Sequence, residues 1–334
     1  MSEPLLSVRN LAKSFHVADR SSVWPRARKL QAVANVSLDV AEGETIGIVG
    51  ESGCGKSTLA KCLARLIEPT GGSIQFKGRD FLALDSEELR LARRDMQFVF
   101  QDPYSSLNPR MTVGQIISET WRVLPGILPR TQWRARATEL VRLVGLNAGD
   151  LDRHPHQFSG GQRQRIGIAR ALASEPRLLI CDEAVSALDV SVQAQVVNLF
   201  QDIQDKTGVA LVFIAHDLSV VRHIADRTLV MYLGGLVEEG PSEQIFNAPA
   251  HPYSQALISA VPVVDPAVRA ARQTIEVPGE PPSPLDRPSG CPFRTRCWKA
   301  SEVCGIRNPE LEYFSDQRKT ACHHAEVQYV MGSR

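Results

Sequence analysis

Apolar and polar residues alternate near the N-terminus of the chain, and continuous apolar runs follow farther along. The alternation at residues 5–15 and 30–40 predicts antiparallel strands with one buried face. The continuous runs predict fully buried strands of a parallel sheet. They lie at residues 45–49, 96–100, 178–183 and 209–215. Because helical patterns separate these runs, the chain is predicted to have an α/β fold.

A long strand-free stretch runs from residue 112 to residue 146. Its apolar positions have helical spacing, include Trp121 and Trp133, and are interrupted by two prolines. We therefore predict a helical subdomain at about residues 104–165, inserted into the α/β core.

Three glycines lie between the buried run at residues 45–49 and a segment with helical periodicity. The residues from Gly50 to Thr58 read Gly-Glu-Ser-Gly-Cys-Gly-Lys-Ser-Thr, which fits the pattern G-x-x-x-x-G-K-[ST]. Backbone N–H groups of such a turn point at a phosphate, and the helix dipole favours the negative charge. Lys56 is placed to contact the β- and γ-phosphates and Ser57 to ligate Mg²⁺. The predicted phosphate-binding residues are Ser52, Gly53, Cys54, Gly55, Lys56, Ser57 and Thr58.

Further polar groups occur at a second helix start and at the ends of two predicted strands. Ser159, Gly160, Gly161 and Gln162 open a helix that runs to about residue 173, which is also a common way to cap a helix. Asp182 and Glu183 end an apolar strand, where carboxylates can hold Mg²⁺ and orient or deprotonate a water. His216 follows the next apolar run at the edge where ligands gather in such sheets, although a structural histidine is also common there.

The net charge and the hydropathy of the chain bear on its partners and its location. With 38 Lys and Arg against 37 Asp and Glu, the net charge is +1, so nucleic acid is not an expected partner. No apolar run approaches the length of a membrane span, and the N-terminus lacks the pattern of a signal peptide. We therefore expect a cytoplasmic chain that reaches a membrane only through partners.

Over residues 5–260 the chain resembles the nucleotide-binding subunits of ATP-binding cassette (ABC) transporters. The resemblance rests on the phosphate loop, the Ser-Gly-Gly-Gln signature and four single features in family order, which are Gln101, Asp182-Glu183, Asp189 and His216. It implies a RecA-like P-loop core with an antiparallel β subdomain and an inserted helical subdomain. It also implies two such domains paired head to tail, with each ATP held between the phosphate loop of one subunit and the signature of the other.

The resemblance assigns roles residue by residue. Phe15 matches the aromatic residue that stacks on adenine, and Gln101 matches a contact to phosphate and Mg²⁺. Glu183 matches the general base, and His216 matches the sensor of the γ-phosphate. Phe158 stands where leucine is usual, at an apolar position that leaves the phosphate-facing residues of the signature intact. The resemblance therefore implies an ATPase with Mg²⁺ as its cofactor.

Finer features are similar to the oligopeptide, dipeptide and nickel uptake branch, in particular to its dipeptide F-type subunit. They lie at residues 101–109, 186–195 and 251–257. The implied partners are a second, different ATPase chain, two membrane-spanning permease subunits and an extracytoplasmic substrate-binding protein, at the cytoplasmic face of the membrane. Peptides are the expected cargo, with nickel, glutathione and opine or sugar conjugates as alternatives. A translation or repair ATPase is a further alternative, but such proteins carry two cassettes or a coiled-coil insertion.

Two segments have no place in the common cassette. The basic stretch at residues 18–29 is predicted to be a solvated hairpin insertion or a docking surface. We predict a nucleotide-binding domain at residues 1–261 and an extension at residues 262–334 that starts with a proline-rich connector.

Four cysteines gather in the extension, with the spacing C-x5-C-x6-C-x17-C. Four thiolates suit a [4Fe-4S] cluster or Zn²⁺, and the peptide-importer branch carries a similar tail. We expect Cys291, Cys297, Cys304 and Cys322 to hold a [4Fe-4S] cluster, with Zn²⁺ or unliganded thiols as alternatives. The adjacent residues at 323–324 are histidines that could replace a thiolate.

Overall fold

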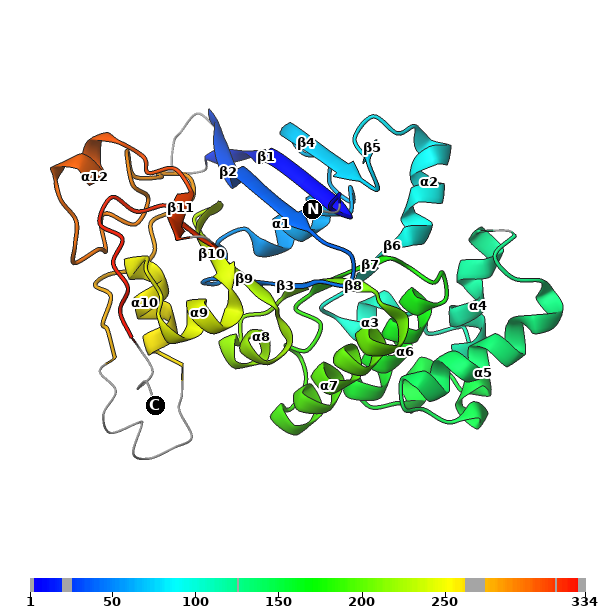
Figure 1. Cartoon of the computed structure of the whole chain (residues 1–334). Coiled ribbons are helices and arrows are strands. Elements are labelled where there is room, and N and C mark those ends of the chain that lie inside the picture. The colour runs from blue at the N-terminus through cyan, green and yellow to red at the C-terminus, as the bar shows by residue number, and fades with distance from the viewer. Residues whose placement is uncertain (1–2, 20–25, 125, 262–273, 316, 330–334) are drawn as a thin grey trace. The chain divides into compact units, whose positions relative to one another are not determined.

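The computed structural model describes residues 3–19, 26–124, 126–261, 274–315 and 317–329 (Figure 1). The chain divides into two compact units, each made of three segments. The first unit contains Met1–Leu6, Val40–Thr45 and Gln75–Ala215. The second contains Ser7–Asp39, Ile46–Ile74 and His216–Arg334.

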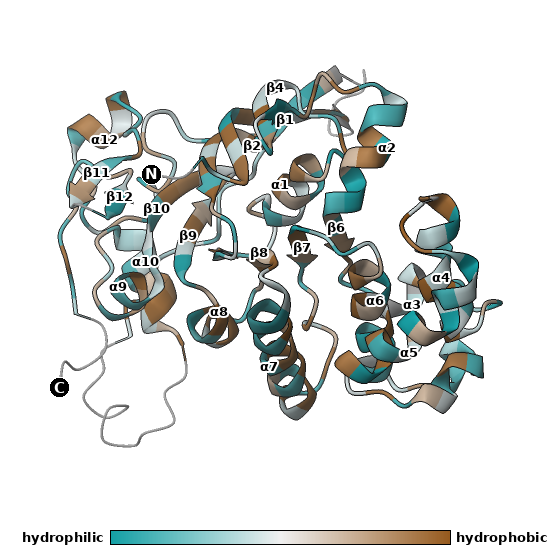
Figure 2. Cartoon of the chain, turned by 45° about the vertical axis from the view of Figure 1, so that its right-hand side comes forward, coloured by the Kyte–Doolittle hydropathy of each residue, from teal (hydrophilic) through white to brown (hydrophobic). Residues whose placement is uncertain are grey.

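Parallel strands form the centre of the first unit. β7 pairs on one side with β6 and on the other with β8, and Cys181 is in register with Val99 and with Phe213. Every residue of β7 and β8 is buried, and both strands are hydrophobic in Figure 2. This confirms the buried parallel strands predicted at residues 178–183 and 209–215, whereas in β6 only Met96 and Val99 are buried. The bounds are Met96–Val99 for β6, Leu178–Asp182 for β7 and Ala210–Ile214 for β8.

Helices make up most of the rest of the first unit. Between Pro103 and Arg177 the described residues form helices and turns and no strand, as the spacing at residues 112–146 predicts. α4, α5 and α6 pack on one another (Figure 1), and the indole N–H of Trp121 donates to the carbonyl of Ala173 at 2.7 Å. The helices are α2 (Ser86–Asp95), α3 (Pro103–Ser106), α4 (Val113–Val123), α5 (Trp133–Leu143), α6 (Gly160–Leu172) and α7 (Val190–Thr207), with 3-10 turns at Arg130–Gln132, Ala148–Asp152 and Pro155–Gln157.

The second unit has a sheet in the order β11-β12-β10-β9-β3. β3 runs parallel to β9, whereas β10, β12 and β11 are antiparallel to their neighbours. β12 belongs to the C-terminal extension, so the extension adds two strands to the edge of this sheet. The strands are β3 (Thr45–Val49), β9 (Arg227–Tyr232), β10 (Gly235–Pro241), β11 (Glu312–Ser315) and β12 (Arg318–Thr320). The helices are α1 (Lys56–Leu63), α8 (Leu218–Ile224), α9 (Ser242–Asn247), α10 (Pro252–Ser259) and α12 (Glu302–Ile306).

A separate antiparallel sheet contains β1 (Leu6–Asp19) and β2 (Arg26–Val40). β1 lies between β2 and β4 (Gly71–Phe76), and the last residues of β4 pair with β5 (Arg79–Asp80). Both long strands extend beyond the predicted alternation, into the basic stretch at residues 18–29. Arg28 of β2 donates to the carbonyl of Leu285 at 3.1 Å and pairs with Asp286, so part of this stretch contacts the connector. Residues 20–25 lie outside the described part of the chain.

No helix among the described residues is both long enough and apolar enough to cross a bilayer.

Candidate nucleotide-binding site

The phosphate loop joins the end of β3 to the start of α1, as predicted. Gly55 precedes α1 with a φ of 105°, a left-handed value that favours glycine. A Cβ on Gly55 would lie 2.1 Å from the carbonyl oxygen of Ala32, and one on Gly50 would lie 2.2 Å from that of Met231. Backbone atoms cannot move aside as a side chain can, so both positions require glycine. Ser52 and Gly53 are exposed at the turn, while Ser57 and Thr58 are half-buried.

Lys56 is the first residue of α1, and its side chain turns back over the loop. The residue is only 4% exposed, and its Nζ donates to the carbonyl oxygens of Gly50 at 2.8 Å and Glu51 at 2.9 Å. Its Nζ also lies 3.8 Å from the Cys54 Sγ. The lysine therefore stands inside the curl of the loop, where a phosphate-binding cation has to be.

Two other predicted residues of the second unit are accessible to a ligand. Phe15 lies on β1 with its ring half-buried, and the Lys13 Nζ stands 5.0 Å from the ring centroid. His216 is exposed and comes directly before Asp217, whose carboxylate accepts from the Ser219 N–H at 2.8 Å and caps α8. Neither side chain is buried in the core, so the structural interpretation of His216 as a core histidine is not favoured.

In the first unit the structure brings Gln101 and Glu183 together. The Gln101 Nε2 lies 2.6 Å from the Glu183 Oε2, although 82 residues separate them in the sequence. Glu183 has a φ of 48°, which is unusual outside glycine, and its N–H donates to the Ile214 carbonyl at 2.9 Å. This sharp turn directly after β7 leaves Asp182 buried at the strand end and places the Glu183 carboxylate against Gln101. A strained backbone that presents a carboxylate is typical of a functional site.

The signature residues form a helix cap. The Ser159 hydroxyl accepts from the Gln162 N–H at 3.3 Å, and the Gln162 side chain accepts from the Ser159 N–H at 3.0 Å. The helix-cap interpretation is therefore correct for the side chain of Ser159, and the helix N-terminus remains an anion-facing group. A Cβ on Gly161 would lie 2.4 Å from the Val192 Cγ1, so this glycine lets α6 approach α7 closely. Asp189 is exposed at the N-terminus of α7.

The loop that follows Gln101 is attached to α6. Arg163 stacks on the ring of Tyr104, with 4.1 Å between the guanidinium carbon and the ring centroid. Arg170 donates to the Ser106 carbonyl at 2.6 Å. The loop that follows Gln101 and the helix of the signature are therefore mechanically linked in the first unit.

The four cysteines of the extension lie near one another, but they do not form a ligand set. Burial and the neighbouring thiols raise the pKa of Cys291 and Cys297 and raise that of Cys322 to about 11. The described residues contain no group of three or more His, Cys, Asp or Glu side chains arranged to hold a metal ion. The structure therefore does not support the expected [4Fe-4S] cluster.

The two histidines beside Cys322 have other partners. The His323 Nε2 lies 2.9 Å from the Arg307 carbonyl oxygen, and the His324 Nε2 lies 2.6 Å from the Ser301 hydroxyl. Both rings thus contribute to the fold of the extension.

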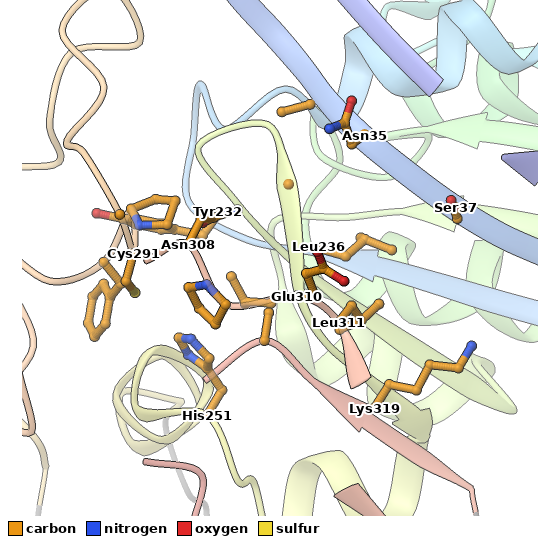
Figure 3. A pocket seen from close by; sticks show the side chains of 18 of the residues that line it. Asn35, Ser37, Tyr232, Leu236, His251, Cys291, Asn308, Glu310, Leu311 and Lys319 are labelled. Carbon is orange, nitrogen blue, oxygen red and sulfur yellow. The ribbon is translucent and has the colours of Figure 1, made fainter. Parts of the chain in front are cut away.

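A cavity of about 670 Å³ lies between β2, β10 and the extension, all in the second unit. In Figure 3, Asn35 and Ser37 project from β2, while Tyr232 and Cys291 lie together on the other side. Glu310 lies on the chain segment that leads to β11. The cavity is thus lined by both polar and apolar residues and by the first cysteine of the extension.

Residues from the C-terminal part of the chain form hydrogen bonds with Glu51 of the phosphate loop, and the sequence patterns did not indicate these contacts. The Glu51 carboxylate accepts from the Arg296 Nη1 at 3.0 and 3.1 Å, and the Glu51 N–H donates to the Tyr253 hydroxyl at 2.8 Å. More than 200 residues separate these partners from Glu51, so no local periodicity could have found the contact.

Comparison with known proteins agrees with this geometry. A family model described as "ABC transporter" matches residues 33–186, and one described as "Oligopeptide/dipeptide transporter, C-terminal region" matches residues 237–304. A probable peptide ABC transporter ATP-binding protein of Sinorhizobium fredii is 52% identical, covering 97% of this chain and 90% of that protein. A dipeptide transport ATP-binding protein of Haemophilus influenzae is 47% identical, covering 97% of each.

The fold is also similar to solved structures. A dimeric ATP-binding cassette in a post-hydrolysis state, bound to ADP and Pi, is 29% identical with a TM-score of 0.63. The similarity covers 71% of this chain and 98% of that one. This cassette has the P-loop ABC ATPase fold, which agrees with the parallel strands, the antiparallel sheet and the helical insertion described above. Because relatives about half identical in sequence match almost its whole length, the chain belongs to the family of ABC transporter ATP-binding subunits, in the oligopeptide and dipeptide group.

Proposed function

We propose that the chain hydrolyses ATP and is a motor subunit of an ABC importer for di- and oligopeptides. One observation carries the hydrolytic part, which is the contact between Gln101 and Glu183 at 2.6 Å. The Gln101 amide nitrogen donates to a carboxylate that can accept the proton of a water, while the oxygen of the same amide can face a metal ion. The full-length similarity to peptide importer subunits supports the rest.

The ATP contacts are assigned by residue type and position in the motifs. Phe15 offers an aromatic face to adenine, and the backbone N–H groups of residues 52–58, together with the Lys56 ammonium, bind the phosphates. Asp189 is a further nucleotide-binding residue, and His216 senses the γ-phosphate.

Magnesium ligation is assigned to oxygen donors, which this ion prefers. We propose Ser57, Gln101 and Asp182 for this role, with Asp182 acting through a water. When bound, the ion neutralises charge on the β- and γ-phosphates. Glu183 receives the proton of the attacking water, and its bond to Gln101 fixes the direction of its carboxylate.

The partners follow from the two separate anion-facing helix starts. We propose that a second, different ATPase chain supplies the signature for this chain's phosphate loop, while Ser159, Gly160, Gly161 and Gln162 face the nucleotide of that partner. The helical subdomain, with the segment at residues 101–109, carries the contact to a permease subunit. The two permease subunits keep the chain at the cytoplasmic face of the membrane. An extracytoplasmic binding protein delivers the cargo.

Glu183→Gln tests the proposal in the complete transporter. The complex is reconstituted in vesicles with its permeases, partner ATPase and binding protein, and peptide uptake and ATP hydrolysis are measured together. We expect the variant to bind ATP and to lose nearly all turnover, because the amide cannot accept a proton from water. Wild-type turnover in this variant would show that Glu183 is not the base. Uptake of nickel, glutathione or an opine conjugate in place of peptides would change the cargo and retain the motor.

We also propose that the four cysteines, which are not arranged as a ligand set in this structure, rearrange to bind a metal centre, a [4Fe-4S] cluster or alternatively Zn²⁺. The support is the number of thiols and their mutual effect on pKa, and no step of ATP hydrolysis depends on the metal. Anaerobically purified protein should be brown and contain about four irons per chain. Cys297→Ser should bleach it and leave ATP binding in place. One zinc without iron would identify the alternative, and the absence of both metals would refute the proposal.

A further inference from the structure

Glu51 is the second residue of the phosphate loop, and its N–H, its carbonyl oxygen and its carboxylate each form hydrogen bonds. Its N–H donates to the Tyr253 hydroxyl at 2.8 Å, and its carbonyl oxygen accepts from the Lys56 Nζ at 2.9 Å. Its carboxylate accepts from the Arg296 Nη1 at 3.0 and 3.1 Å. Tyr253 belongs to α10 and Arg296 to the extension, so distant segments of the second unit meet at one loop residue.

The contact with Arg296 differs from an ordinary surface ion pair. The Arg296 side chain is 9% exposed and that of Glu51 is 28% exposed, so solvent screens this pair less than a surface pair. A single guanidinium nitrogen lies within hydrogen-bond distance of both carboxylate oxygens. Charge-assisted bonds of this kind are among the stronger ones in proteins.

Packing fixes the segment that carries Arg296. The Phe293 ring meets Tyr232 and Tyr253 edge-on, with centroids 5.3 and 5.4 Å apart, and all three rings are buried. The Arg296 N–H donates to the Phe293 carbonyl at 3.0 Å, which closes a tight turn. The aromatic cluster thus positions both groups that hold Glu51, the Tyr253 hydroxyl and the Arg296 guanidinium.

We propose that Arg296 is a positioning residue for the phosphate loop of its own subunit. By holding Glu51, it fixes the carbonyl that Lys56 contacts and so maintains the loop in the geometry that binds a triphosphate. The C-terminal extension thereby contributes to nucleotide affinity without touching the nucleotide, because a loop that is already ordered loses less entropy on binding. This inference rests on the proposed ATP-binding function of the loop.

The alternative role for the same contact is to attach the extension to the rest of the unit. Both roles predict a looser extension when Arg296 is changed. If Arg296 positions the phosphate loop, its replacement should also weaken nucleotide binding, and this effect should require the Glu51 carboxylate. A role in attachment alone predicts no such effect, so nucleotide affinity separates the two roles.

The test uses the full-length chain and titrates it with a fluorescent ATP analogue in the presence of Mg²⁺. For Arg296→Gln we expect about tenfold weaker binding, the size of effect expected for one lost hydrogen bond to a charged group. Arg296→Lys should restore part of the affinity, since it keeps the charge. Arg294→Gln is the matched control, because Arg294 is two residues away and its guanidinium donates to the carbonyl and the hydroxyl of Ser289, at 2.8 and 3.2 Å. The control should bind like the wild type.

A double-mutant cycle with Glu51→Gln makes the test specific. If Arg296 acts through Glu51, its replacement should have little further effect once the carboxylate is absent. Tyr253→Phe provides a second route, since it keeps the ring packing, removes the acceptor of the Glu51 N–H, and should weaken binding as well. Unchanged affinity in Arg296→Gln, or full additivity in the cycle, would overturn the inference. Failure of the proposed function is distinguishable, because the wild type would then not bind the analogue and Lys56→Ala would change nothing.

Discussion

Arg318 on β12 supports a buried carboxylate, and we expect its loss to detach the edge of the second unit's sheet. Glu238 on β10 is fully buried and accepts from the N–H groups of Ala250 at 2.8 Å and His251 at 3.1 Å. Arg318 lies 3.9 Å from this carboxylate and donates to the Ala248 carbonyl at 2.6 Å. In Arg318→Leu the carboxylate would remain buried without a cation.

The burial of this ion pair sets how much free energy Arg318→Leu should cost. Breaking a buried ion pair costs about 3–5 kcal/mol, and the two N–H donors that remain on Glu238 place this case near the lower end. A loss of about 3 kcal/mol corresponds to roughly a 100-fold change in the equilibrium for local opening. Amide hydrogen exchange measures this opening at the pairing of β10 with β12, where the Ala321 N–H donates to the Val237 carbonyl at 2.8 Å.

The destabilisation caused by Arg318→Leu should increase as the pH rises. Burial raises the pKa of Glu238, and Arg318 counteracts this by stabilising the ionised form. With a raised folded-state pKa, the contribution of Glu238 to stability is fully present below its unfolded pKa and is lost as pH rises through the folded value. Removal of Arg318 should raise the folded pKa further, so the variant should be more destabilised at pH 8 than at pH 5.

Lys319→Met is the control for this prediction. Lys319 is the next residue of the same strand and lies 3.6 Å from Glu239, but its side chain is 32% exposed and Arg227 lies at the same distance from that carboxylate. We expect a loss below about 1 kcal/mol. Exchange at β10 and β12 that is equal in the two variants, or independent of pH in Arg318→Leu, would refute the argument.

Further predictions concern the ATP site and the helical subdomain. Lys56→Ala should lose ATP affinity and activity together, as measured by analogue binding and phosphate release. Ser159→Arg should retain ATP binding at the chain's own phosphate loop but abolish hydrolysis at the partner's site in the assembled complex. Equal loss of ATP binding and hydrolysis in the isolated subunit would contradict a shared site. Gly55→Ala should prevent ATP binding, since its Cβ would lie 2.1 Å from a backbone oxygen. Trp121→Phe should lower the free energy of unfolding by about 1–3 kcal/mol in urea titration, because it leaves the buried Ala173 carbonyl without its donor.

The sequence by itself determined the parts of the molecule that depend on local spacing. Continuous apolar runs predicted the buried strands, because strands covered on both faces need no alternation. The glycines of the phosphate loop predicted a strand-to-helix turn, since a side chain would collide with the backbone at two of them. The first helix begins at Lys56, inside the phosphate-loop motif, so the last residues of the motif also form the first turn of the helix.

Tertiary structure alone decided which distant residues meet. Gln101 reaches Glu183 because β6 and β7 are neighbours in one sheet, and Arg296 reaches Glu51 because an aromatic cluster holds the extension against the loop. The pairing of β12 with β10 was likewise absent from the sequence pattern. Alternation and spacing specify which face of an element is buried, whereas the partner of that face is selected by packing over the whole unit, where the free energy of burial is gained.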